Sequence, residues 1–363
     1  MRVRHHRKSY SRSLKPFTHV EIVLHHPTGV LYLACSTRAS RRHWIPALGV
    51  LEEDKITFDD YIATYDPTTD TVTRLTFEGF PTPQGYSAHG MDVVPSASDP
   101  RELYVYAINH RKPVQGPGKH VGADSVVEIF KTKIGGNTLT HVKTVGDPVI
   151  DTPNDVVGSS DGRSFYFTND HGAKVGVVSG PNWRRHFYRH CLSLVQSRFL
   201  EFLGLSRTSV GYCHIDDGCK IAIDGLHGSN GIARALDGTV YVANSKFGEI
   251  RALEEQSDHS LVLTDVIALG AYHGICGRLI RLITSADRLV DNLSIDENGA
   301  LWGAAIPSAL RFLSAYNDFE KVAPSSALQI TKNVGEKAFF GEKFKVEKVR
   351  HRPLKQKELR VNR

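Results

Sequence analysis

The hydrophobic and polar residues of this chain repeat one pattern five times. In each copy a polar residue precedes a short apolar run, a glycine turn follows, and a second run is rich in β-forming residues. Turns of the type Thr-Gly, Asp-Gly and Asn-Gly in four copies are typical of β-hairpins. The copies read EIVLHHPTGVLYLACS from Glu21, HGMDVVPSASDPRELYVYAINH from His89, NDVVGSSDGRSFYFTND from Asn154, NGIARALDGTVYVANS from Asn230 and NLSIDENGALWGAAI from Asn292.

An aromatic residue marks the second run of every copy, at intervals of roughly 60–75 residues. This period fits a four-stranded blade with long connections, and radial repetition of such blades forms a β-propeller. Five copies are visible, and the weakly patterned termini can supply strands for a sixth blade. The sequence therefore does not decide whether the ring of blades closes completely. The aromatic residues are Tyr32, Tyr104, Tyr166, Tyr241 and Trp302.

Two segments interrupt the repeat. Residues 181–205 place apolar residues near helical spacing with arginines between them, which predicts a basic amphipathic helix inserted in the all-β fold. Such a helix can contact a membrane surface, cap a cavity or pack against the blades. Residues 268–285 break the expected strand spacing. No run of 18 or more apolar residues is present, so no transmembrane helix is predicted.

The net charge of +6 is the sum of unlike parts. Residues 1–16 hold six Lys or Arg and no acid, and residues 341–363 hold nine against three Glu. Each end thus contributes +6, which leaves −6 for the rest. A nucleic-acid-binding face would carry its basic residues on the folded domain. We therefore predict no nucleic-acid partner, a propeller domain over 17–349, and disordered basic tails over 1–16 and 350–363.

The five cysteines are few and odd in number, which excludes a disulfide framework. Cys213 and Cys219 can pair across a short loop in an oxidising environment. No CxxC spacing typical of a zinc site occurs.

Polar residues at equivalent positions in the copies of the repeat predict a metal site. The first strand of each propeller blade lines the central channel, so equivalent residues should form a ring. Carboxylates and amide carbonyls without cysteine are the oxygen ligands that Ca²⁺ prefers. Taken singly, each of these residues is more often part of an Asx turn. The ring consists of Glu21, Asn154, Asn230 and Asn292, with Asp155 and Asp291 beside two of its members.

His89 and His110 belong to one copy of the repeat, at the start of one strand and the end of the next. Antiparallel pairing brings these two ends together. Two imidazoles near a cation can relay a proton from water, although a single histidine in a strand is more often a core or turn residue.

The blocks HGMDVV, VYAINH, PNDVV, FTNDHG, SNGIARALDGTVYVANS and VDNLSIDENGALWG resemble the serum paraoxonase/arylesterase family, in its fungal branch. The resemblance runs from about residue 20 to residue 348, with the blocks in the family's order. It implies a six-bladed propeller with two calcium ions in its central tunnel and hydrolase activity on lactones and aryl esters. It also implies a secreted or membrane-associated protein, although residues 1–16 lead into no apolar stretch typical of a signal peptide.

The resemblance also implies roles for single residues. Asn154, Asn230, Asp291 and Asn292 would bind the catalytic calcium ion. Asp155 and the backbone carbonyl of Met91 would bind the structural ion. The family's histidine pair would be His89 and His110, and His171 would lie in the substrate pocket.

The chain departs from the family pattern at two site positions. Family members carry adjacent Glu-Asp in the first blade, whereas this chain reads Val20-Glu21-Ile22. Spacing to the turn glycine assigns Glu21 to the catalytic ion, and a one-residue shift assigns it to the structural ion. A pocket histidine of animal members is replaced by Ile306.

Three functions remain open from the sequence. The first is calcium-dependent hydrolysis of a small-molecule ester or lactone, with a polarised carbonyl and water activated by His89. The second is an inactive propeller that serves as a binding or scaffold module. The third is an enzyme similar to gluconolactonase or strictosidine synthase. No GxSxG elbow for a serine nucleophile is present, and the oligomeric state is not predicted.

Overall fold

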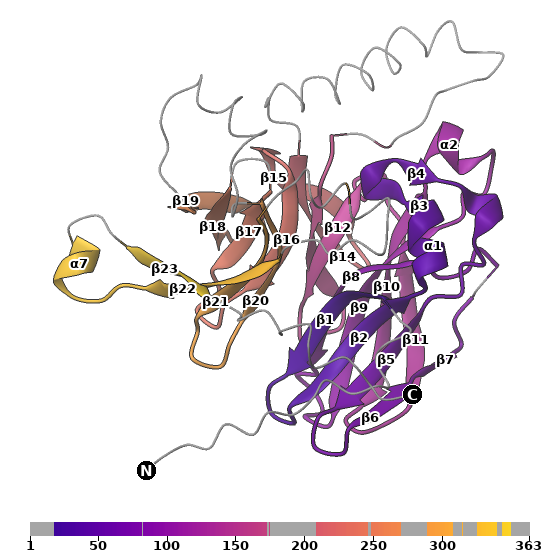
Figure 1. Ribbon diagram of the computed structural model, residues 1–363, viewed down its shortest axis with the longest axis horizontal. Coiled ribbons are helices and arrows are strands. Elements are labelled where there is room, and N and C mark those ends of the chain that lie inside the picture. Colours follow the sequence, from indigo (N-terminus) through magenta and orange to yellow (C-terminus); the bar gives the residue numbers. More distant parts are fainter. Residues whose placement is uncertain are drawn as a thin grey trace, which may run out of the picture.

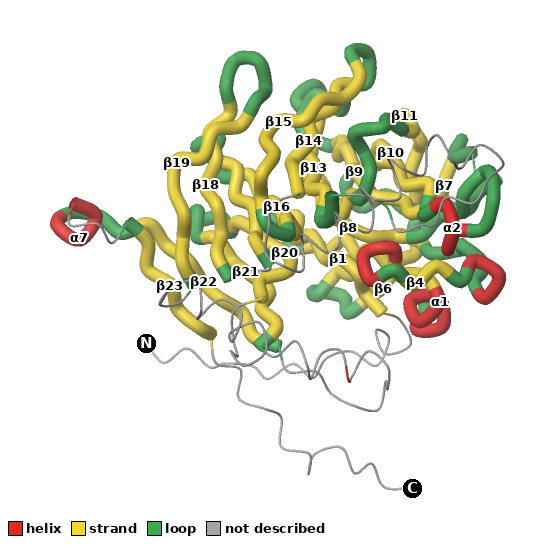
Figure 2. The backbone as a smooth tube through the Cα atoms, turned by 90° about the horizontal axis from the view of Figure 1, so that it is seen from above, coloured by secondary structure: helices red, strands yellow, loops and turns green. Residues whose placement is uncertain are grey.

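The computed structural model of the chain describes residues 18–81, 83–172, 174, 208–245, 248–269, 289–307, 314, 325–339 and 343–349. Most of their regular structure is β-strand, and the helices are few and short. Five sheets stand side by side, and their innermost strands contact one another in succession from β1 to β20 (Figures 1 and 2). The described residues therefore form an all-β propeller with five blades, which confirms the predicted all-β propeller, while the sixth blade stays a prediction.

The first two blades occupy the N-terminal half of the chain. The first has the order β1 Thr18–His25, β2 Val30–Ser36, β5 Tyr61–Asp66 and β6 Thr71–Arg74. The second has β8 Ala88–Pro95, β9 Glu102–Arg111, β10 Asp124–Lys133, β11 Thr138–Val145 and, at its outer edge, β7 Thr76–Glu78. Because β7 runs parallel to β11, the connection between the blades adds a strand to the second sheet.

The other three blades each have four antiparallel strands in sequence order. The third consists of β12 Pro153–Gly158, β13 Ser164–Asn169, β14 Thr208–His214 and β15 Gly218–Leu226. The fourth consists of β16 Ser229–Arg234, β17 Val240–Asn244, β18 Glu249–Glu255 and β19 Leu261–Ala268. The fifth consists of β20 Leu289–Ile295, β21 Leu301–Ile306, β22 Ser326–Lys332 and β23 Phe344–Val349, with the short helix α7 Glu336–Phe339 between the last two.

Apolar side chains fill the spaces between neighbouring blades. Tyr32 of the first blade packs in one cluster with Phe130 of the second, and Tyr106 packs in another with Phe165 of the third. Burial of such side chains is the main source of stability, at about 1.5–3 kcal/mol for each large one. All five aromatic residues of the predicted repeat lie in the second strand of a blade, so the period correctly identified the blades.

Each innermost strand carries a β-bulge, where two of its residues face one residue of the second strand. A bulge bends the strand and breaks the alternation of its side chains. All five bulges lie at the polar residue that begins each copy of the repeat. The bulged pairs are Val20–Glu21, His89–Gly90, Asn154–Asp155, Asn230–Gly231 and Asp291–Asn292.

Two bulges carry glycine because adjacent inner strands approach closely there. A Cβ atom on Gly90 would lie 2.5 Å from the backbone oxygen of Asn154. A Cβ atom on Gly231 would lie 2.4 Å from the backbone oxygen of Asp291. A larger residue would push the inner strands apart, so glycine at these positions keeps the five bulges close to one another.

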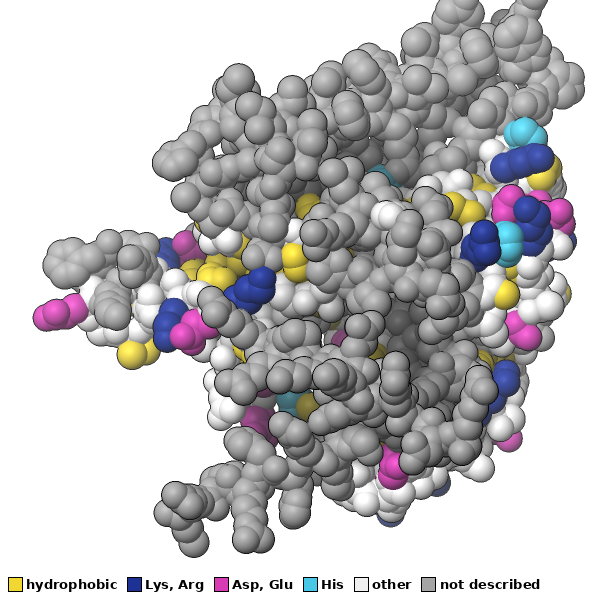
Figure 3. Space-filling view, in the orientation of Figure 1, with side chains coloured by type: hydrophobic (Ala, Val, Ile, Leu, Met, Phe, Trp, Pro, Cys, Tyr) yellow, Lys and Arg dark blue, Asp and Glu magenta, His cyan; other side chains and the backbone are white. Residues whose placement is uncertain are grey.

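A small cap lies over one end of the second blade (Figure 1), and the repeat pattern did not predict it. Trp44 is fully buried in this cap, packs against Phe58, and donates from Nε1 to the backbone oxygen of His110 at 2.9 Å. On the face shown in Figure 3, basic, acidic and histidine side chains gather over α1 and α2. The cap elements are α1 Arg38–His43, β3 Trp44–Ile45, η2 Pro46–Leu48, β4 Val50–Leu51, η3 Glu53–Lys55 and α2 Gly118–Val121.

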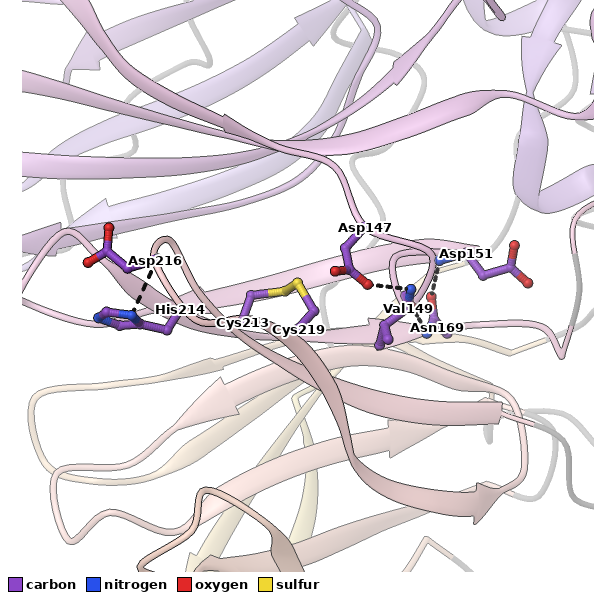
Figure 4. Close-up of a disulfide and its surroundings, with 8 residues drawn as sticks. All are labelled: Asp147, Val149, Asp151, Asn169, Cys213, His214, Asp216 and Cys219. Carbon is purple, nitrogen blue, oxygen red and sulfur yellow. Dashed lines mark hydrogen bonds between the residues drawn. A yellow bond between two sulfur atoms is a disulfide. The ribbon is translucent and has the colours of Figure 1, made fainter.

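A disulfide joins Cys213 to Cys219 across the hairpin between β14 and β15 (Figure 4). The strand register places the two residues directly opposite each other. The pairing that the short spacing suggested is therefore present in the structure. Cys35 is buried and takes no part in a disulfide, and its Sγ donates to the backbone oxygen of Leu33.

Several predictions concern residues outside the described ranges. The amphipathic helix over 181–205, with its membrane contact, lies outside them, as do most of 268–285 and both basic tails. In the described residues no helix is long and apolar enough to span a membrane.

The first and fifth blades are joined by hydrogen bonds from His26 Nε2 to the oxygen of Ile295 (3.1 Å) and from Asn292 to Glu21.

Candidate metal centre and histidine pair

Four acidic side chains from four blades gather near the axis. Burial raises the pKa of Glu21 well above its usual range, and the charge of Asp155 raises it further. Burial raises the pKa of Asp155 to about 7, with Asp92 and Asp291 adding to the effect. The pKa values of Asp92 (to about 6) and Asp291 are also raised, in both cases mainly by burial. The charges of the other acids act on Glu21 and on Asp155, which indicates that the four lie near one another.

Two of the acids also connect adjacent blades. Asp92 Oδ2 accepts a hydrogen bond from the backbone N–H of Gly158 at 2.9 Å, and Asp155 Oδ2 accepts one from Ile232 at 2.9 Å. In each case the donor belongs to the inner strand of the next blade. The two aspartates therefore fix the spacing of the second, third and fourth blades around the axis. Asp92 was not predicted from the sequence.

The three predicted asparagines each turn their amide N–H groups toward a carboxylate. Asn154 Nδ2 donates to Asp170 Oδ2 at 3.2 Å, and Asn292 Nδ2 donates to Glu21 Oε2. The side chain of Asn230 hydrogen-bonds to Asp291. The Oδ1 atom of Asn230 is buried and has no hydrogen-bond partner among the described residues. A buried amide oxygen without a partner is unfavourable, and a cation is one group that would satisfy it.

The donor set fits a hard divalent cation such as Ca²⁺. It combines carboxylates with amide oxygens and contains no cysteine, which is the ligand chemistry of calcium. Burying four carboxylates with little compensating positive charge is costly. In the described ranges, however, no three His, Cys, Asp or Glu side chains are arranged as a ready group of metal ligands. The residues thus fit calcium in their chemistry, while their present hydrogen bonds are made to backbone N–H groups and amides.

The bulges separate residues that the count to the turn glycine placed together. Asn154 and Asn230 occupy the first position of their bulges, whereas Glu21 and Asn292 occupy the second. Glu21 thus shares its position with Asp155. The register of the first blade therefore corresponds to the one-residue shift that assigns Glu21 to the structural ion. It also places Val20 at the first bulge position, which Asn154 occupies in the third blade.

One cation, Arg41 of α1, lies beside this centre and was missed in the sequence. Its Nη1 is 3.4 Å from the backbone oxygen of Ala88, to which it donates, next to His89. Burial raises the pKa of Asp60 to about 6, and the charge of Arg41 partly offsets this rise, as it does for Asp291. Among the described residues this guanidinium supplies one positive charge beside the four acids, which leaves most of their charge uncompensated when they are ionised.

His89 and His110 are in contact, as the predicted strand pairing requires. Their ring centroids lie 4.9 Å apart with the planes at 82°. Burial lowers the pKa of His110 to about 3, and Arg41 and Lys174 act in the same direction. Burial also holds the pKa of His89 well below its usual range, with smaller effects from His110 and Arg41. Both imidazoles are therefore neutral near pH 7, the form in which a histidine accepts a proton.

A small pocket, partly open to solvent, lies beside His110. The cap and the second and third blades form its walls. Asp170 lines it and accepts from Asn154, so the pocket reaches the acidic centre. The lining residues are Pro46, Ala47, Leu51, His110, Gly122, Ala123, Ser125, Asp151, Thr152, Pro153, Asp170 and Lys174.

His171 lies next to this pocket but is not part of its lining. Its Nε2 is 2.9 Å from the backbone oxygen of Ala47, and its backbone N–H donates to Thr152 Oγ1 at 3.1 Å. The side chain thus connects the third blade to the cap. The role that the resemblance gives His171 in the substrate pocket stays a prediction.

Buried asparagines at the ends of second strands hold the start of the inner strands. Asn109 Oδ1 accepts from the N–H of Ser87 at 2.9 Å, just before His89. Asn169 Oδ1 accepts from the N–H of Thr152 at 2.9 Å, just before Asn154. The sequence carried a signal for these residues, because asparagine recurs at this place in the copies of the repeat.

Solved structures with a similar fold include two enzymes. The periplasmic gluconolactonase PpgL of Pseudomonas aeruginosa matches with a TM-score of 0.44 and 10% identity, covering 91% of this chain and 71% of that chain. A luciferin-regenerating enzyme matches with a TM-score of 0.43 and 12% identity, covering 81% and 72%. At these scores the likeness carries no argument about this chain.

Curated relatives are similar over part of the sequence. Serum paraoxonase/arylesterase 1 of Rattus norvegicus is 29% identical over 213 residues, which are 58% of this chain and 49% of that protein. Serum paraoxonase/lactonase 3 of Oryctolagus cuniculus is 27% identical over 256 residues, 70% of this chain and 58% of that protein. The chain thus spans about half the length of the curated relatives it matches. Residues 52–342 match the family described as Arylesterase. This match covers most of the chain and agrees with the resemblance seen in its motifs, and the chain therefore belongs to the arylesterase family.

Proposed function

We propose that this protein is a calcium-dependent hydrolase of lactones and aryl esters. The observation that carries the proposal is the convergence of carboxylates and asparagines from successive inner strands beside two neutral histidines. Membership of the arylesterase family supports the same reaction class. The substrate would be a small-molecule ester or lactone bound in the pocket beside His110.

The bulged residues would hold calcium. Amide oxygens and one carboxylate would face the catalytic ion, and the backbone carbonyl of Met91 would face the structural ion. When bound, calcium supplies a Lewis acid that polarises the ester carbonyl and stabilises the developing oxyanion. The ligands proposed for the catalytic ion are Asn154, Asn230, Asp291 and Asn292, and Asp155 with Glu21 would bind the structural ion.

His89 and His110 would carry out the proton transfer. His89 would take a proton from the attacking water, because its imidazole is neutral and lies at the bulge beside the proposed calcium ligands. His110, in ring contact with His89, would accept the proton onward. Thr152 and Asp170 in the pocket wall are polar groups that can orient the substrate.

Hydrolysis of a lactone and of an aryl ester with and without EGTA tests the proposal. We expect turnover that EGTA abolishes and added calcium restores, with calcium bound to the purified chain. Turnover that is insensitive to EGTA, or a chain that binds no calcium, would contradict it. The control is heat-denatured protein with added calcium, which should show no turnover.

A binding or scaffold module is the second candidate. It is favoured by the first blade, where Val20 stands at the bulge position that carries Asn or Asp in the third, fourth and fifth blades. Such a protein would show no chelator-sensitive turnover, so the same assay separates the two candidates. We further propose a sixth blade and a helix over 181–205 as parts of the complete fold.

A further inference from the structure

Ser125 occupies a position that the proposed reaction has not yet used. It is the second residue of β10, and the strand register pairs it with His110. Its side chain is largely buried, lines the pocket, and places Oγ 2.8 Å from His110 Nδ1. Among the described residues this is the only hydrogen bond to the His110 ring, because Nε2 is buried without a partner.

This single hydrogen bond allows two tautomers of His110. If Ser125 Oγ accepts from Nδ1–H, then Nε2 carries a lone pair. If the hydroxyl donates to Nδ1, then Nε2 carries a hydrogen without an acceptor. Unpaired buried N–H groups are rarer than acceptors with a spare lone pair. The first tautomer is therefore favoured, and it leaves Nε2 able to receive a proton.

We propose that Ser125 is a positioning residue, which holds His110 in the Nδ1–H tautomer so that Nε2 can take the proton passed on by His89. This inference rests on the proposed function, because it assigns Ser125 a part in the same reaction. The serine hydroxyl rotates freely about its bond and can turn its own hydrogen toward the pocket.

The proton transfers balance along this path. His89 gains one proton from the attacking water and gives one from its other ring nitrogen to His110 Nε2. His110 gives its Nδ1 proton to Ser125 Oγ, and the serine hydroxyl gives its hydrogen to solvent in the pocket. Each residue ends in its starting charge, and one proton has moved from the attacking water to solvent. Each imidazole ends in its other tautomer, and exchange of one proton in each direction with solvent restores the starting form before the next turnover, with Ser125 favouring the Nδ1–H form of His110. Arg41 and Lys174 disfavour a positive charge on His110, which favours onward transfer.

Three variants test the role of the hydroxyl. Ser125→Thr keeps the hydroxyl, Ser125→Val has the shape of threonine without it, and Ser125→Ala removes it with little change in volume. Ser96→Ala is the control, because Ser96 is a buried serine of the same blade whose Oγ bonds to Ser98 Oγ at 2.9 Å. It follows β8 at the end away from His89.

The first measurement is the tautomer of His110, from the ¹⁵N shifts of labelled histidine rings in the calcium-loaded protein, with the spectrum of His110→Gln as the assignment. We expect Nδ1–H in the wild type, Ser125→Thr and Ser96→Ala, and Nε2–H in the Ala and Val variants. The second measurement is steady-state hydrolysis. We expect kcat to fall about tenfold in Ala and Val with KM unchanged, and to stay within about threefold in Thr.

The outcomes separate this inference from the proposed function. If the wild type shows no EGTA-sensitive turnover, the proposed function fails and the tautomer assignment can still be read. If turnover is present but Ser125→Val keeps the wild-type kcat or tautomer, the positioning role of Ser125 is wrong. If neither Ala nor Val folds, the wild-type spectrum decides, because an Nε2–H tautomer there overturns the proposal.

Discussion

The inner strands β8 and β12 have the same backbone and opposite chemistry. Both carry a two-residue bulge at the same level, which presents His89–Gly90 in one case and Asn154–Asp155 in the other. Burial lowers the pKa of His89 and raises that of Asp155, so the same surroundings disfavour the charged form of both side chains. The shared backbone bulge therefore determines the position of the functional group, and the identity of the side chain determines its chemistry.

A cation would act differently on the two strands. It would return Asp155 of β12 to its charged form, and it would keep His89 of β8 neutral. The comparison thus assigns metal binding to the acidic bulges and proton transfer to the histidine bulge. Each of the following changes should disturb one of these functions and spare the other.

The largest loss of activity is expected from Asn292→Ala. The amide belongs to the acidic centre, where Asn292 hydrogen-bonds to Glu21. Removing a group that holds the carbonyl-polarising site should lower lactone turnover by about 10²–10³ and weaken calcium binding. Calcium titration and kinetics on the same sample measure both. Asn298→Ala, in the exposed turn after β20, is the matched control, and wild-type turnover in Asn292→Ala would remove the ligand assignment.

His89→Gln should lower turnover by about 10² through loss of the base. Calcium content should stay unchanged, because His89 is not among the proposed ligands. Kinetics together with metal analysis of the purified variant test this separation. His259→Gln, at an exposed position, is the control. Loss of bound calcium together with turnover would show that proton transfer at β8 and metal binding at β12 are not separate functions.

The calcium-free protein should become less stable relative to Asp155→Asn as pH rises from about 4 to 7. The comparison cancels the opposite trend that the lowered pKa values of His89 and His110 give to both proteins. Asp155 and Asp92 have folded pKa values raised to about 7 and about 6. Between the unfolded and folded pKa values the native state holds the extra proton, so the free energy of unfolding falls as pH increases, and the fall is complete above the folded pKa.

We expect the difference in the free energy of unfolding between the wild type and Asp155→Asn to fall by about 4 kcal/mol over this range, because the amide does not titrate. Denaturant unfolding of both proteins after dialysis against calcium-free buffer measures it. Calcium should remove the decrease, since bound metal favours the ionised acids. A difference that is constant or rises with pH would contradict the raised pKa of Asp155.

The smallest effect is expected from Val20→Glu. It places an acid at the first bulge position of β1, where the other blades carry His89, Asn154, Asn230 and Asp291. Calcium affinity should rise about tenfold, since an added carboxylate ligand tightens a calcium site. Isothermal titration measures the affinity and the number of ions, with Val20→Leu as the control. An unchanged affinity would place Val20 outside the metal centre.

Much of the blade architecture could be predicted from the chain itself. The turn glycines and the aromatic period identified the first and second strands of five blades, and the ends of one hairpin identified His89 and His110. These signals are local, because a hairpin is formed by residues close in sequence. The resemblance to the family, drawn from the same blocks, agrees with the family match.

The missed residues depend on contacts between distant parts of the chain. Asp92 reads as an ordinary strand residue, and its partner Gly158 lies in the next blade. Arg41 and Trp44 belong to a connection with no repeated pattern, so their place above the histidines follows only from the cap. A bulge inserts a single residue into a strand, and counting residues to the turn did not reveal which of two neighbours faced the axis.

The five bulges also bear on how such a protein changes over generations. Each bulge offers two adjacent positions, and the described side chains at them are not part of the apolar clusters between blades. A substitution there exchanges a ligand or a base without repacking the interior, within the limit that close backbone approach sets at Gly90 and Gly231. New activities can thus arise one blade at a time, on a scaffold whose folding is inherited intact.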